Sequence, residues 1–304
     1  MLSLTVVTGA LELGFIYALV AMALFLSFRI LNIADMTTDG AFTLGCAVSA
    51  TVAVAGHPLL ALPLAMLAGA AAGFITASLQ TRLGVPSILA GIITNTGLYT
   101  VNLAVMGFSS NVNMLKTPTI FTKVQSILPI GAYKLVTAAL ISCLVCLLLI
   151  AFLRTRLGLS VRATGDNPDM VRASSINTAT TITIGLCLSN SMTALSGAVL
   201  AQYQRTADVN LGTGMVVIGL ASLIIGETIF ARRSIYFKAV GAMVGSIIYR
   251  FVIAIALRLD LPSEFLKLIS AVIVALAISL PYVQGKLRFR RARKAASEGK
   301  EARV

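Results

Sequence analysis

Apolar segments of spanning length recur along the whole chain, and they limit the fold more than any other feature. A run of about 20 apolar residues matches the thickness of the bilayer core when it forms an α-helix. Of the 304 residues, 58% are hydrophobic and only 12% are charged, which is too little charge for the surface of a soluble domain. The sequence therefore predicts an all-α, polytopic helical membrane protein with about 8–9 transmembrane helices.

Polar residues, glycines and prolines divide the apolar sequence into nine predicted helices. Their approximate ranges are 4–28, 40–55, 59–80, 85–107, 133–153, 178–202, 214–230, 239–257 and 265–281. Residues 1–285 are predicted to form a single transmembrane domain, followed by a basic cytoplasmic tail at 286–304. The first residues show neither a basic region nor a cleavage site, so no removable signal peptide is expected.

The distribution of Lys and Arg predicts the orientation in the membrane. The net charge of +13 fits the excess of basic residues on the cytoplasmic side of membrane proteins, so no nucleic-acid partner is expected. If every helix crosses, 17 Lys and Arg residues lie on the side of the tail and 6 on the other side. This difference predicts an external N-terminus and a cytoplasmic C-terminus.

The longest polar segment within the apolar sequence spans residues 154–177 and lies on the predicted cytoplasmic side. Asn167 is a candidate N-cap and Pro168 fits the first position of a short helix. A small apolar face would be formed by Val171, Ala173 and Ile176. The segment is either a solvated loop that only sets orientation or a helix that docks a cytoplasmic protein. The candidate docking residues are Arg154, Arg156, Arg162, Asn167, Pro168 and Arg172.

Two stretches suggest an internal repeat. When residues 31–45 are aligned with residues 205–219, an offset of 174 pairs Gly40 with Gly214 and Gly45 with Gly219. In the predicted topology, the two stretches follow crossings of opposite direction, so the pair would be an inverted repeat of the kind found in transport proteins. Chance similarity is the alternative, because glycine and threonine are common in membrane helices.

Polar side chains within or beside the apolar runs are the candidate lining of a solute pathway. Unsatisfied polar groups are costly in hydrocarbon, so these residues must face protein, water or solute. The candidates are Asn32, Asp35, Thr37, Thr38, Asp39, Asn95, Thr96 and Asn190. Hydrogen bonds between helices are the alternative explanation for such residues.

No group of residues predicts catalysis, a metal site or a bound cofactor. His57 is the single histidine, and the sequence contains no phosphate-binding loop ending in Gly-Lys-Ser/Thr. The chain is therefore expected not to be an enzyme, and an ATP-driven role would require partner ATPases. The main alternative is an ion-coupled secondary transporter or channel, in which Glu12, Asp39 and Glu227 would be proton or cation sites.

Three stretches in order resemble the branched-chain amino acid permease family of bacterial ABC importers. They are RILNIADMTTDGAFTLG at 29–45, TRLGLSVRATGDNPDMVRASSIN at 155–177 and GLASLIIGETIF at 219–230. The chain departs from the family where it has Ile33-Ala34-Asp35-Met36 in place of Phe-Ala-His-Gly, and Ile225-Gly226 in place of a Gly-Gly pair. The pattern is similar to a branch that has been linked to tryptophan or tyrosine.

This resemblance implies a permease subunit that moves an amino acid or a similar small polar solute across the bacterial inner membrane. It implies two cytoplasmic ATP-binding subunits, which would bind the ATP. It also implies an extracytoplasmic solute-binding protein or lipoprotein, a second permease subunit that makes a homodimer, and membrane lipid around this chain. If the chain works with such ATPases, a helix in the 154–177 segment would bind them and pass their motion to the membrane helices.

Overall fold

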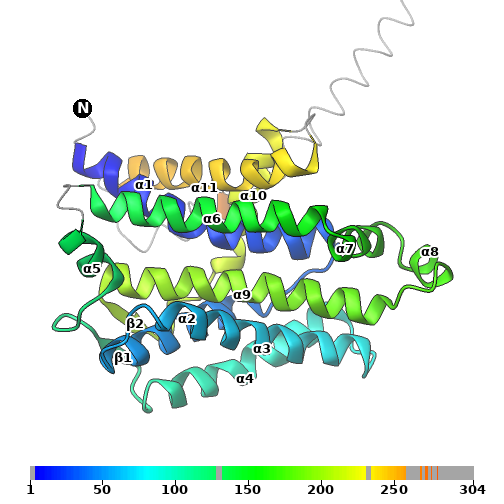
Figure 1. Cartoon of the computed structure of the whole chain (residues 1–304), viewed down its shortest axis with the longest axis horizontal. Coiled ribbons are helices and arrows are strands. Elements are labelled where there is room, and N and C mark those ends of the chain that lie inside the picture. Colours follow the sequence, from blue (N-terminus) through cyan, green and yellow to red (C-terminus); the bar gives the residue numbers. More distant parts are fainter. Residues whose placement is uncertain are drawn as a thin grey trace, which may run out of the picture.

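The computed structural model describes residues 4–127, 132–230 and 234–257, and also the single positions 268, 271, 272, 275 and 279. The described residues form a helical bundle (Figure 1), which confirms the all-α membrane architecture. The elements from the N-terminus to the middle of the chain are α1 (Leu4–Leu24), the π-helix η1 (Phe25–Ile30), α2 (Thr38–Val54), α3 (Ala61–Thr81), α4 (Ser87–Val105), β1 (Asn111–Asn113), α5 (Ile120–Ile127) and α6 (Tyr133–Arg154).

The remaining elements are α7 (Arg156–Asp166), α8 (Pro168–Ala173), α9 (Thr178–Gln204), β2 (Thr206–Asp208), α10 (Met215–Ile229) and α11 (Ile235–Leu257). The predicted tail at 286–304 lies outside the described residues, as does the predicted helix at 265–281 except for the single positions given above.

Helices α1 and α9 form the centre of the bundle. The residues from Ile16 to Leu26 on α1 and η1 and from Ser189 to Gln202 on α9 are all buried. The two helices are joined by hydroxyl hydrogen bonds, one of which runs from Ser189 Oγ to the Ala23 carbonyl at 2.8 Å. Such bonds satisfy polar side chains where the bilayer offers no water. The other long helices pack around this pair, so their outer faces are left for lipid or for another protein.

The internal repeat is visible in the helix boundaries. Adding 174 to the bounds of Leu4–Ile30, which is α1 with η1, gives 178 and 204, the bounds of α9. The same offset carries the bounds of α3 to 235 and 255, inside α11, and it carries α2 onto a segment that overlaps α10. Helices α1 and α9 run in opposite directions, and so do α3 and α11 (Figure 1). The two halves are therefore an inverted repeat.

Matching close contacts support this repeat. Gly45 on α2 lies so close to the Ala194 carbonyl on α9 that no side chain would fit between them. The repeat partner of Gly45 is Gly219 on α10, where an added Cβ would lie 2.9 Å from the side chain of Val20 on α1. Val20 and Ala194 are related by the same offset of 174. In each half, a glycine therefore lets a short helix approach a central helix of the other half.

Helices α2 and α10 are too short to cross the membrane alone. They have 17 and 15 residues, so at 1.5 Å per residue they are about 26 and 22 Å long, against a bilayer core of about 30 Å. Of the described helices, six are long and apolar enough to span: Leu4–Ile30, α3, α4, α6, α9 and Ile235–Ala256 of α11. The structure does not confirm that the two helices predicted at 40–55 and 214–230 cross the membrane in full.

The bundle has two polar ends, which lie at opposite sides of Figure 1. At one end, named here the α7–α8 end, the predicted loop forms two helices instead of one. At the other end, the β1–β2 end, strand β1 pairs antiparallel with β2 and Val112 lies opposite Ala207. This pair and α5 lie where the sequence predicted only polar loops, because strand partners 95 residues apart leave no local pattern in the sequence.

Candidate functional site

The first candidate site is the junction where α2 and α10 begin. Asp39, in the first turn of α2, accepts hydrogen bonds from the backbone N–H groups of Gly214 and Val216, each at 2.9 Å. The first N–H groups of a helix lack partners within the helix, and its N-terminus carries a partial positive charge. One carboxylate from the first half of the repeat therefore caps the short helix of the second half.

A second contact ties the same two segments together. The Gly212 N–H donates to Thr43 Oγ1 at 3.1 Å, and that hydroxyl donates to the Asp39 carbonyl at 3.1 Å. Gly40 packs against Asn95 and Leu98 on α4. Since Asn95 lies near the middle of the 19-residue helix α4, both short helices begin deep within the bundle. The junction is thus a polar region deep within the bundle.

Four of the predicted pathway residues form a buried hydrogen-bond network beside this junction, in which Asn190 Oδ1 has no partner among the described residues. Asp35 is buried and accepts from Asn190 Nδ2 at 2.6 Å and from the Thr37 N–H at 2.9 Å. Thr38 Oγ1 donates to the Asp35 carbonyl at 3.1 Å, and the hydroxyls of Thr37 and Thr76 lie 2.7 Å apart. These contacts join the start of α2 to α3 and α9. In this conformation the four side chains hold helices together and are not open to a solute.

The other predicted pathway residues on α2 and α4 meet at a cavity of about 220 Å³. Its polar lining is shared among α2, α4 and the loop between β2 and α10. The lining residues are Asp39, Gly40, Thr43, Asn95, Thr96, Tyr99, Asn102, Val209, Asn210, Gly212 and Thr213. Thr96 and Tyr99 are exposed, so the cavity opens on the outer side of α4. The structure thus brings together Asp39, Asn95 and Thr96.

Tyr99 and Asn102 were missed by the sequence reasoning. They follow Asn95 by four and seven positions, and residues at these spacings share one face of a helix. That spacing was the available signal, because one helical face then carries three polar side chains in an apolar span. Asn102 is 2% exposed, and its Nδ2 donates to the Gly40 carbonyl at 3.2 Å.

Asn32 lies apart from this cavity. It has a left-handed backbone with φ of 56° and lines a separate space of about 640 Å³ at the α7–α8 end. Arg29, Asp166 and Lys238 line the same space. Asn32 is therefore placed among charged groups at the α7–α8 end, and its role in a pathway stays a prediction.

The acidic residues of the ion-coupled alternative lie at separate places. Glu12 accepts from the Tyr203 hydroxyl at 2.7 Å near the β1–β2 end. Glu227 lies 2.8 Å from Arg29 Nε at the opposite end of the bundle. Asp39 caps α10 between them. Within the described ranges, no three His, Cys, Asp or Glu side chains gather as metal ligands.

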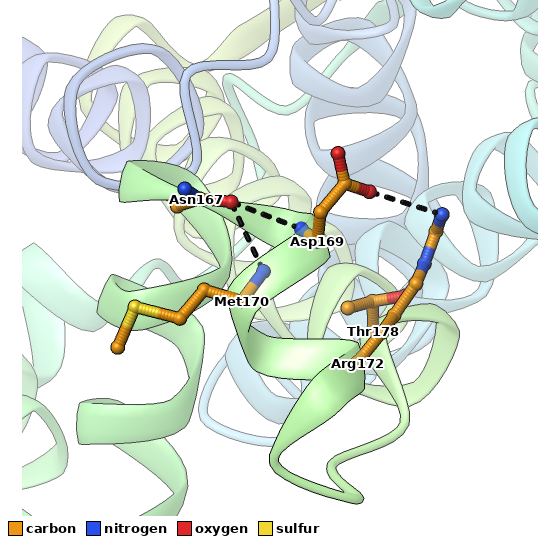
Figure 2. Close-up of polar contacts among 5 residues, drawn as sticks. All are labelled: Asn167, Asp169, Met170, Arg172 and Thr178. Carbon is orange, nitrogen blue, oxygen red and sulfur yellow. Dashed lines mark hydrogen bonds and ion pairs between the residues drawn. The ribbon is translucent and has the colours of Figure 1, made fainter.

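The second candidate site is the α7–α8 end, where three successive helices begin at capped positions. Thr155 Oγ1 accepts from the Gly158 N–H at the start of α7. Asn167 Oδ1 accepts from the N–H groups of Asp169 and Met170 at 3.1 and 3.0 Å, with Pro168 in the first turn of α8 (Figure 2). The predicted cap and helix start at Asn167-Pro168 are confirmed. Asn177 caps α9 in the same way.

The arginines of this end do not share a single face. Arg154 lies over the ring of Tyr236, 4.8 Å from its centroid. Arg172 donates from Nε to Thr178 Oγ1 at 3.2 Å and lies 3.5 Å from Asp169 (Figure 2). Arg156 is exposed and Arg162 is half-buried.

The predicted apolar face of α8 is only partly formed. Val171 is buried, but Ala173 and Ile176 are exposed. Met170 on α8 is 67% exposed, and Leu157 and Leu159 on α7 are exposed as well. The surface of the α7–α8 end therefore carries exposed apolar and basic side chains, on helices whose N-termini are capped.

Helix α7 is in direct contact with the membrane helices. Gly165 lies against the Ile30 carbonyl at the end of η1, with no room for a side chain between them. The hydroxyls of Thr164 and Thr181 lie 2.8 Å apart and join α7 to α9. A π-helix such as η1 is a rare interruption that is often found at functional sites. A displacement of α7 would therefore act on both central helices.

The comparisons with known proteins agree with this architecture. The sequence model of a family described as "Branched-chain amino acid transport system / permease component" matches residues 6–278. A tyrosine transport system permease protein of Clostridioides difficile is 34% identical over 261 residues, which are 85% of each chain. An uncharacterised protein of Rickettsia prowazekii is 31% identical over 282 residues, covering 91% of this chain and 98% of its own length.

An autoinducer 2 import system permease protein of Yersinia enterocolitica is 28% identical over 258 residues, covering 82% of this chain and 67% of its own. No solved structure matches the chain. The match spans most of the described helices, including both candidate sites. The chain belongs to the branched-chain amino acid transport system permease family.

Proposed function

We propose that this chain is the membrane-spanning subunit of an ATP-driven importer that moves an amino acid or a similar small polar solute across the bacterial inner membrane. The family and the permeases named among its relatives support import by a multi-subunit transport system. The relative named for tyrosine supports an amino acid as the solute. The chain binds no ATP itself in this proposal, because cytoplasmic partner subunits supply the ATP-binding sites.

The observation that carries the proposal is the contact between α7 and the central helices. ATP-binding subunits that close on ATP must move an element that reaches the solute pathway, and such coupling needs a shared two-state element. Helix α7 meets η1 at Gly165 and α9 at Thr164. From η1 the chain runs directly to Asp39 at the cavity. A rigid, capped helix pair at the surface is suited to receive the motion.

The proposed orientation places the α7–α8 end in the cytoplasm. Several basic residues lie at this end. Lys238 and Arg29 line a space together with α7, Arg82 lines one with the start of α9, and Arg154 contacts Tyr236 on α11. Basic residues favour the cytoplasmic side. The β1–β2 end would then face outward and receive the solute-binding protein or lipoprotein, with the N-terminus external and the C-terminus cytoplasmic.

A second permease subunit is proposed to cover the face of α4 and make a homodimer. Asn95 is half-buried in the middle of this apolar helix, where contact with lipid would leave its amide unsatisfied, whereas the exposed Thr96 hydroxyl donates to the Ile92 carbonyl. The outer faces of α3 and α6, with exposed leucines such as Leu67 and Leu147, suit membrane lipid instead. The pathway would then run between the cavities of the two subunits.

Reconstitution in proteoliposomes tests the proposal. The permease, its candidate ATP-binding subunits and the binding protein would be combined with a panel of labelled amino acids. Uptake is expected only when ATP is present on the same side of the membrane as the ATP-binding subunits. It is also expected to require the binding protein on the opposite side. Uptake that follows a proton or sodium gradient without ATP would overturn the proposal in favour of a secondary transporter.

A further inference from the structure

A residue that lines the cavity formed by α2, α4 and the β2–α10 loop carries a buried hydrogen-bond acceptor that lacks a donor. Asn102 uses its Nδ2 on the Gly40 carbonyl, but its Oδ1 is buried and has no partner among the described residues. Buried polar atoms are nearly always paired, so an unpaired one in a cavity calls for an explanation. A ligand that brings an N–H group into the cavity would supply the missing donor.

The charges around the cavity suit a donor that carries positive charge. Asp39 lines the cavity, and neither of the two ion pairs within the described ranges involves it. Each of its oxygens accepts one backbone N–H, whereas a carboxylate offers about four acceptor positions. No Lys or Arg lines this cavity in the described part of the chain. An ammonium group has three N–H donors and matches both Asp39 and Asn102.

The opposite charge is available at the start of α2. At the start of this helix the Asp35 side chain accepts from the Thr37 N–H, whereas the Gly40 N–H has no acceptor among the described residues. Gly40, in the first turn of α2, lines the cavity. A free N–H group in the first turn of a helix, where the helix carries a partial positive charge, can donate to a carboxylate. The cavity thus presents an anionic and a cationic pole within a space too small for most complete ligands, which need about 300 Å³ or more.

We propose that this cavity binds the zwitterionic head group of an α-amino acid, which deepens the proposed function by assigning its solute site within the permease. The ammonium group lies against the Asp39 carboxylate and Asn102 Oδ1, and the carboxylate lies against the α2 N-terminus at Gly40. The solute side chain extends past Tyr99 toward the open side of the cavity. The cavity therefore recognises the head group of the amino acid, and its side chain is recognised outside the cavity.

Equilibrium binding to the full-length permease in lipid nanodiscs, without ATP-binding subunits or binding protein, tests this assignment. The probes are glycine, L-leucine and L-tyrosine, with tyramine and 3-(4-hydroxyphenyl)propanoate as analogues of tyrosine that each lack one charge. All three amino acids are expected to bind, because they share the head group, and each tyrosine analogue is expected to bind at least tenfold more weakly than tyrosine, since a charged hydrogen bond is lost.

Two variants locate the binding. Asn102→Leu removes the unpaired acceptor and should weaken amino-acid binding about tenfold. Gln80→Leu is the matched control, because Gln80 also has a buried amide atom without a described partner but lies outside the cavity. It should leave affinity unchanged. Asp39→Asn keeps a helix-capping oxygen but loses the charge, so amino-acid and tyramine binding should both fall.

The outcomes separate this assignment from the proposed function. Equal binding by wild type and Asn102→Leu, or stabilisation by NaCl alone relative to choline chloride, would overturn the assignment in favour of another site or a cation site. ATP-dependent uptake by a permease that binds none of the amino acids would overturn it as well, yet leave the transport function standing. Binding that is lost in Asn102→Leu but without any ATP-dependent uptake would overturn only the transport function.

Discussion

Two aspartates four residues apart, Asp35 and Asp39, have different surroundings. Asp35 is 3% exposed and its contacts close a network with Asn190 and Thr37. Asp39 borders a cavity while it caps a helix from the other half of the repeat. Substitutions at this junction should therefore separate stability from transport, although all these residues share one short segment of sequence.

At Asp35, replacement by alanine should mainly reduce stability. Asp35→Ala leaves one N–H of the Asn190 amide and the Thr37 N–H without their present acceptor in a buried region, and each unsatisfied group costs about 1–3 kcal/mol. The thermal unfolding temperature of the purified permease should fall clearly. Asp169→Ala is the control, because Asp169 is exposed and its ion pair with Arg172 contributes little. Unchanged unfolding of Asp35→Ala would contradict the buried network.

At Asn95, the expected effect is on transport instead. Its side chain has no hydrogen-bond partner among the described residues, and it lines the cavity. Asn95→Ala should lower uptake about tenfold, the loss expected for one hydrogen bond to a charged solute, while the unfolding temperature and yield stay close to wild type. If folded protein and uptake fall in equal proportion, Asn95 is a packing residue and not part of the pathway.

Among the elements, η1 and α7 form the connection between the polar end and the membrane. Gly165→Ala would place a methyl group against the Ile30 carbonyl and push α7 away from η1. Because the outer face of α7 is unchanged, the ATP-binding subunits should still co-purify, but uptake per ATP hydrolysed should fall. Gly9→Ala on α1, where an added Cβ meets nothing within 4 Å, is the matched control. Normal coupling in Gly165→Ala would exclude this contact as the route.

Helix α8 and the arginines around it belong to the docking surface in our proposal. The double variant Arg162→Glu with Asn167→Ala removes the cap of α8, which costs about 1 kcal/mol, and reverses a charge that has no ion pair among the described residues. A reversed charge at a docked interface repels its partner. The ATP-binding subunits should then co-purify poorly, while binding of the solute-binding protein is retained. Normal association would mean that the segment only sets orientation.

Across the whole molecule, local patterns in the sequence predicted local structure well. Apolar runs located the helices, Asn167-Pro168 marked the start of α8, and the 174-residue offset found the repeat. The depth at which α2 begins was not predictable in this way, because it depends on the contact of Asp39 with Gly214, 175 residues away. Sequence periodicity indicates which face of a helix is apolar, but it does not indicate the depth in the membrane at which the helix begins.

The orientation of the bundle is the last property that can be tested directly. Asn113→Cys and Arg162→Cys, each in a background without the native cysteines Cys46, Cys143, Cys146 and Cys187, place one thiol at each polar end, since Asn113 is in β1 and Arg162 in α7. Both positions are at least partly exposed. The excess of Lys and Arg at the α7–α8 end should hold that end in the cytoplasm. In intact cells, a membrane-impermeant thiol reagent should label position 113, while position 162 should react only after the membrane is opened. Labelling of position 162 from outside would mean that the bundle has the opposite orientation, with the proposed docking helices on the side of the membrane that lacks ATP.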